Sequence, residues 1–104
     1  MTTFDDREKA FEKKFAHDAE MQFRAEARRD KLLALWAAGL MDTPAEEIPA
    51  YVQAVIRADM EEAGDEDVFR KLAADLGDRV TEAELRAKMA EFMTEAKAQI
   101  ISET

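Results

Sequence analysis

Apolar residues recur at intervals of three and four along most of this 104-residue chain. This spacing places side chains on one face of an α-helix. The pattern is clearest near the C-terminus, where the residues that share one helical face are Leu85, Met89, Phe92, Met93, Ala96 and Ile100. No segment alternates between apolar and polar residues, so no strand is predicted. The pattern therefore predicts an all-α protein.

Capping residues and helix breakers divide this pattern into four helices. The first covers a stretch without Gly or Pro and would be roughly 50–55 Å long at about 1.5 Å per residue. The second follows the capping sequence Thr43-Pro44-Ala45-Glu46 and begins or kinks at Pro49. The third ends with a glycine in the left-handed conformation, and the fourth begins with a capping box. The residues predicted to bound these helices are Thr3 and Gly39, Thr43 or Pro49 and Gly64, Asp65 and Gly77, and Thr81 and Ser102.

The first predicted helix changes character along its length. Phe4, Phe11 and Phe15 form a narrow stripe, within about 40° of one another on a helical wheel. From Ala25 onward the apolar face broadens, as in a packed helix. The remaining helices, roughly 18–33 Å long, cannot cover the first one. We therefore expect a four-helix bundle whose long first helix protrudes or frays at its N-terminal end, with an interaction arm at 1–21 and the bundle at 22–104.

Charge separates the same two parts of the chain. The formal net charge is -9, yet residues 1–31 hold eight basic and eight acidic side chains, whereas residues 32–104 hold seven and sixteen. The aromatic stripe thus lies in a neutral segment, and the bundle is acidic. A nucleic-acid partner is not expected, because its binding surface would be basic.

Several classes of protein are excluded by composition. The chain has one His and no Cys, and it has no Gly-rich phosphate loop or glycine-framed serine, so we predict no enzyme, catalytic residue, metal ligand or cofactor. The longest apolar stretch has about ten residues, far fewer than the roughly 20 that span a bilayer. Acidic residues precede any apolar run, unlike in a secretory signal. We therefore expect a cytoplasmic protein without membrane insertion.

Three further features have simpler explanations than ligand binding. His17 is better explained as a solvated or partner-contacting residue than as a pH sensor. Trp36 is expected to anchor the core, and the C-terminal methionines to fill it. The acidic residues around Gly64 suit helix capping better than a cation site, and they are Asp59, Glu61, Glu62, Asp65, Glu66 and Asp67.

The aromatic stripe is the main candidate functional site. Aromatic residues exposed in a row usually have a partner, and a helix often lays such a stripe into a groove. The stripe could instead fold back on the bundle, pair with a second copy, or lie on a membrane surface, which its zero net charge disfavours. The residues expected to contact the partner are Phe4, Lys9, Phe11, Lys13, Lys14 and Phe15.

The run KFAHDAEMQFRAEARRDKLLALWAA, from Lys14 to Ala38, resembles the signature of the zeta subunit of alphaproteobacterial F-type ATP synthases. The segment RADMEEAGDEDVFRKLAADL, from Arg57 to Leu76, and the closing amphipathic helix are similar to it as well. Members are small four-helix proteins whose N-terminal segment inhibits ATP hydrolysis by wedging into the catalytic head, at an interface of catalytic and rotor subunits. The resemblance implies that residues 2–18 form the inhibitory segment and that the bundle is its anchor.

A small helical sensor that binds a nucleotide or an ion in its bundle is the competing hypothesis. Arg28, Arg29 and Lys31 could contact phosphates, although salt bridges are the commoner use of such side chains. A homodimer joined through the aromatic stripe is a third hypothesis.

Overall fold

The structure, a computed structural model, describes residues 18–62 and 64–103. This part of the chain forms four α-helices and no strand, which confirms the predicted all-α class. The predicted helical residues that precede Asp18 lie outside it. The helices are α2 (Ala19–Leu40), α3 (Ile48–Asp59), α4 (Glu66–Leu76) and α5 (Glu82–Glu103), with 3-10 turns η1 (Ala45–Glu47) and η2 (Gly77–Arg79).

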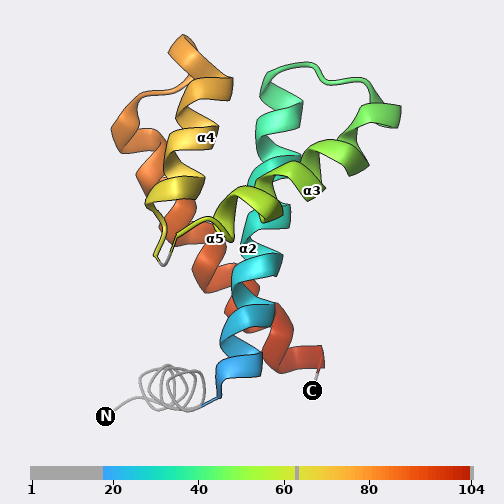
Figure 1. Cartoon of the computed structure of the whole chain (residues 1–104), viewed down its shortest axis with the longest axis vertical. Helices are drawn as coiled ribbons and strands as arrows, with labels where there is room; N and C mark the ends of the chain where they lie inside the picture. Colours follow the sequence, from blue (N-terminus) through green and yellow to red (C-terminus); the bar gives the residue numbers. More distant parts are fainter. Residues whose placement is uncertain (1–17, 63, 104) are drawn as a thin grey trace.

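The two long helices, α2 and α5, cross one another and form the centre of the bundle (Figure 1). Helix α3 packs against α2, and α4 contacts both α3 and α5. The start of α2 and the end of α5 lie at the same end of the molecule (Figure 1). The predicted arm therefore joins the bundle beside its C-terminus.

Buried apolar side chains form two separate clusters along α2. The smaller cluster joins Met21 and Ala25 to Ile100 near the end of α5. Trp36 lies at the edge of the larger cluster, where its ring meets that of Phe92 edge to face, with 6.4 Å between centroids. The larger cluster contains Leu33, Ala34, Ala37, Val52, Val55, Val68, Leu72, Leu76, Leu85 and Met89.

Local sequence signals set several helix starts as predicted. The Thr81 hydroxyl accepts from the backbone N–H of Glu84 at 3.1 Å, and the Glu84 carboxylate accepts from the N–H of Thr81 at 2.9 Å. This reciprocal pair is the expected capping box. Helix α3 begins at Ile48 with Pro49 in its first turn, where a missing N–H costs no intrahelical bond.

The junction between α2 and α3 differs from the prediction. Gly39 lies inside α2, and Asp42 takes the left-handed conformation (φ 55°) after the helix ends. The N–H of Thr43 donates to the carbonyl of Ala38 at 2.9 Å, so Thr43 closes α2 and does not cap the next helix. Pro44 is followed by the 3-10 turn η1, which replaces the expected helical start. No side chain caps this turn.

Two other helix ends also differ. Helix α3 ends at Asp59, before the predicted stop at Gly64. Gly77 has a positive φ of 54°, as expected of a residue that terminates α4, but its ψ of −127° lies outside the left-handed helical region. The chain then enters η2, which explains why the simple glycine cap is absent.

Candidate functional site

The described part of the chain begins at Asp18, which lies within the predicted arm at 1–21. Its backbone is extended (φ −124°, ψ 98°), and its carboxylate accepts from the N–H of Met21 at 3.1 Å. Asp18 is therefore the N-cap of α2, and the long first helix does not continue through it without interruption. The residues predicted to contact a partner lie outside the described part, as does His17, and they are Phe4, Lys9, Phe11, Lys13, Lys14 and Phe15.

A buried ion cluster lies between the two apolar clusters of α2. Its centre is Arg29, whose side chain is only 1% exposed. Nε of Arg29 donates to Oδ1 of Asp30 at 3.0 Å, and Nη1 donates to Oδ1 of Asp65 at 2.6 Å. Nη2 lies 3.4 Å from Oδ2 of Asp59. One guanidinium thus joins α2 to the end of α3 and the N-cap of α4.

The cluster holds three carboxylates for one guanidinium, which affects their protonation. Burial raises the pKa of Asp30 to about 8, and the neighbouring Asp59 adds to this effect, while Arg29 opposes it. No donor from the described residues reaches the buried Oδ2 of Asp30. Protonation turns this oxygen into a donor toward Asp59 and relieves the repulsion between the two acids.

Arg29 keeps its charge in this setting. Burial acts to lower the pKa of Arg29, but the charges of Asp30 and Asp65 outweigh it, so the net shift is upward. The guanidinium is therefore a permanent cation inside the bundle.

Most of the acidic residues around Gly64 have a defined side-chain contact. Asp65 is the N-cap residue of α4, but its side chain binds Arg29 and caps nothing. Glu66 and Glu62 form ion pairs with Arg86 and Arg70 on the surface. The carboxylate of the buried Asp67 accepts from the backbone N–H groups of Glu62 and Val68 at 3.0 and 2.8 Å, which closes the loop. Among the residues described, no group of His, Cys, Asp or Glu has an arrangement that could hold a metal ion.

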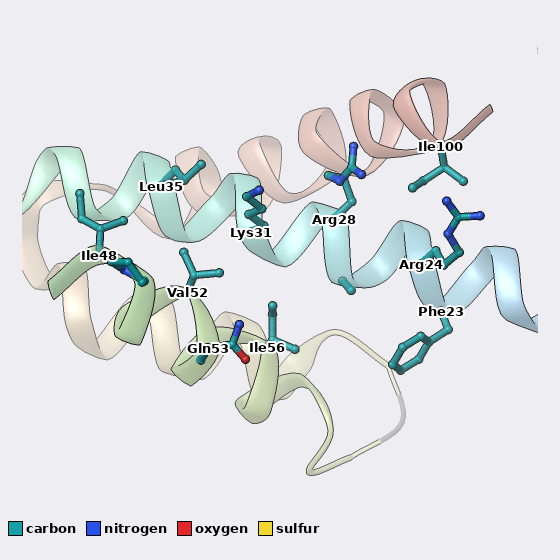
Figure 2. A pocket seen from close by; sticks show the side chains of 12 residues that line it. Phe23, Arg24, Arg28, Lys31, Leu35, Ile48, Val52, Gln53, Ile56 and Ile100 are labelled. Carbon is teal, nitrogen blue, oxygen red and sulfur yellow. The ribbon is translucent and has the colours of Figure 1, made fainter. Parts of the chain in front are cut away.

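A groove of about 570 Å³ lies along α2, beside α3 and the end of α5 (Figure 2). Its wall on α3 is largely apolar, with Ile48, Val52 and Ile56 beside the polar Gln53. Arg28 and Lys31 line it from α2.

The three residues considered for phosphate contact are divided between two places. Arg28 and Lys31 share the groove, whereas Arg29 lies in the ion cluster. Arg28 donates to the two carboxylate oxygens of Glu103 at 2.6 and 2.9 Å, which ties α2 to the end of α5. Lys31 is exposed. Contact with a phosphate remains a prediction for all three.

Sequence reasoning did not find Asp30 or Asp59 as partners of Arg29. A signal for the buried arginine was nevertheless present. Arg29 stands four residues after Ala25 and four before Leu33, both of which are buried, so it interrupts an apolar row of the helix. A charged residue in such a row needs a buried partner.

The family model described as "ATPase inhibitor subunit zeta" matches residues 1–99 of the chain. The chain belongs to this family. This match confirms the resemblance seen in the sequence. A solved structure entitled "Solution NMR structure of the protein" is similar to this zeta-family chain at 50% identity and a TM-score of 0.73, covering 81% of this chain and 99% of that one. No curated protein matches the chain.

Membership carries a coarse functional assignment. Zeta-family proteins are inhibitory regulators, so this chain is a regulatory subunit and not an enzyme. Its partner is accordingly an ATP synthase. In residues 18–62 and 64–103, no helix has both the length and the apolar character that crossing a membrane requires.

Proposed function

We propose that this zeta-family chain inhibits ATP hydrolysis by the F-type ATP synthase, on the cytoplasmic side, by inserting its N-terminal segment into the catalytic head. The insertion site is an interface of catalytic and rotor subunits. The observation that carries this proposal is the junction at Asp18. Among the described residues, Met21 is the first with a buried side chain, and every predicted contact residue precedes it in sequence.

The physical basis is burial of the aromatic stripe. Each buried phenylalanine contributes roughly 1.5–3 kcal/mol relative to an exposed one. Rotary hydrolysis requires the catalytic interfaces to open and close, so a segment that buries Phe4, Phe11 and Phe15 in one interface selects its closed state. The lysines at 9, 13 and 14, which flank Phe11 and Phe15 in the sequence, supply charged contacts. The bundle acts as the anchor.

The direct test is deletion of the arm. The deletion should remove residues 2–17 and keep Asp18, because that carboxylate caps α2. We expect the truncated protein to lose inhibition of the cognate ATP synthase in an ATPase assay, while its melting temperature stays close to that of the parent. A matched control replaces Phe4, Phe11 and Phe15 with Ser in the full-length chain, and it should lose inhibition as well. Equal inhibition by the truncated protein would contradict the insertion proposal.

Nucleotide or ion binding in the bundle is the second candidate function, and the groove is what favours it. Its apolar wall and its basic residues Arg28 and Lys31 suit an anionic ligand with an apolar ring. Titration with ATP, ADP and Mg²⁺, followed by NMR, tests this candidate. Chemical-shift changes confined to residues of the groove would support ligand binding. Unchanged spectra would leave the protein partner as the only candidate.

A further inference from the structure

The groove along α2 has large apolar side chains at both ends that remain exposed. Phe23 is 56% exposed at one end, and Leu35 is 43% exposed at the other. All the charged residues that line the groove are basic, namely Arg24, Arg28 and Lys31 (Figure 2). The groove therefore suits an amphipathic, acidic-edged helix better than a small neutral molecule.

The length of the groove matches the aromatic stripe of the arm. Phe23 and Leu35 are twelve residues apart on one helix, or about 18 Å. A helix that carries Phe4 to Phe15 would extend over about 17 Å. Three phenylalanines can thus cover the apolar wall that α3 and the end of α5 supply.

The charges of the two segments also match in register. Asp5, Glu8 and Glu12 are spaced at three and four residues, so they form one row beside the aromatic stripe of a helix. The basic residues of the groove are spaced at four and three. An antiparallel arrangement therefore aligns both rows at once, and the facing pairs are Asp5 with Lys31, Glu8 with Arg28, and Glu12 with Arg24.

The junction at Asp18 is compatible with a chain reversal. Its extended backbone precedes the first turn of α2, and the three residues 16–18 would connect the two antiparallel segments. Helical hairpins commonly use connections of two to five residues. Arg28 already binds Glu103, so Arg24 and Lys31 are the stronger determinants of this alignment.

We propose that residues 4–15 dock antiparallel to α2 in this groove when the protein is free. The docked arm hides its aromatic stripe, and the ATP synthase must compete with the bundle for it. This consequence for inhibition rests on the proposed function, whereas the docking itself does not. Docking in the groove therefore lowers the apparent affinity of the inhibitor for the ATP synthase.

Paramagnetic relaxation measures docking without the ATP synthase. The chain contains no cysteine, so Thr2→Cys gives a single thiol for a nitroxide label at the start of the arm. We expect signals of Lys31, Leu35 and Val52 to broaden more than those of α4, which does not line the groove. Absence of this selective broadening would overturn the proposal. Broadening that appears only between labelled and unlabelled copies would overturn it too, in favour of a dimer.

Charge reversal provides the matched comparison. The double variant Arg24→Glu/Lys31→Glu should lose most of the broadening, and adding Glu12→Lys/Asp5→Lys should restore it. Undiminished broadening in the double variant, or no recovery in the quadruple one, would contradict the register. Loss of two exposed ion pairs should weaken docking of the arm by about 2- to 30-fold. Because more of the arm is then free, the double variant should inhibit the ATP synthase at a correspondingly lower concentration. If the broadening is found but no variant inhibits, the proposed function fails and the docking stands.

Discussion

Nη1 of Arg29 donates to Oδ1 of Asp65 at 2.6 Å across 36 residues of sequence. Arg29 is in the middle of α2, and Asp65 is the N-cap residue of α4. Because the same guanidinium also lies beside Asp59, this contact holds the loop between α3 and α4 against the centre of the bundle. The cluster therefore joins three helices through a single guanidinium.

Replacement of Arg29 tests the importance of this cluster. Arg29→Met leaves the carboxylates of Asp59 and Asp65 without their cation, and loss of one partner from a buried ion pair costs about 3–5 kcal/mol. For a domain of this size the melting temperature should fall by more than about 10 °C. Thermal unfolding followed by circular dichroism measures the change.

Arg28→Met is the matched control for that variant. Arg28 is next in sequence, and its pair with Glu103 is partly exposed. Such surface pairs contribute about 0–1 kcal/mol, so the control should lose only a few degrees. Equal losses in the two variants would show that burial of Arg29 has no special effect.

The raised pKa of Asp30 gives the protein a distinctive pH dependence. The pKa is about 8 in the folded protein against an ordinary value of 3.8, so the folded state binds a proton in this range that the unfolded state releases. The free energy of unfolding should therefore fall as pH rises from about 4 to about 8, with the loss complete above 8. Asp30→Asn cannot titrate and should flatten this decline. Urea unfolding midpoints at about pH 6 and pH 9 measure the difference.

Asp78→Asn is a suitable comparison for the pH experiment. Asp78 is an exposed carboxylate in η2, away from the ion cluster. This variant should follow the parent protein across the same pH range. A decline that is equally steep in Asp30→Asn would show that another group causes it.

Short-range signals explain which parts of the fold could be predicted. Thr81 and Glu84 cap α5 within one helical turn, and Pro49 restricts its own backbone near the start of α3. The starts of both helices can therefore be predicted from neighbouring residues. The break at Asp18 was harder to predict. Its flanking residues favour a helix on both sides, and only its side-chain bond to Met21 marks the start of α2.

Long-range contacts explain what could not be predicted. The acidic residues near Gly64 have ordinary capping spacing, and nothing local indicates that Asp59 and Asp65 bind Arg29. The groove likewise depends on the approach of α3 to α2, which no single segment encodes. Its basic row was visible in the sequence, but the placement of Arg28 and Lys31 in the groove and of Arg29 in the core was not.

The capping box at the start of α5 is expected to contribute about 1 kcal/mol to the free energy of unfolding. Thr81→Ala removes the hydroxyl that accepts from Glu84, and loss of an N-cap costs about 0.5–2 kcal/mol. Thr94→Ala, inside the same helix, is the control of opposite sign, because Ala favours helix interiors more than Thr does. Chemical unfolding of the two variants should give a decrease and a small increase. A loss in both would indicate that α5 is sensitive to any change of this kind.

Asp42→Gly is expected to stabilise the protein. Asp42 holds a left-handed backbone at φ 55° after the end of α2, a conformation that costs an ordinary residue about 1–2 kcal/mol. Glycine avoids that strain but loses about 0.5–1 kcal/mol to the greater freedom of the unfolded chain, so the net gain should be about 0–1.5 kcal/mol. The matched control Asp78→Gly lacks the positive φ and should lose stability instead. Because both variants replace an exposed Asp by Gly, a gain in both would show that removal of negative charge, and not relief of strain, is responsible.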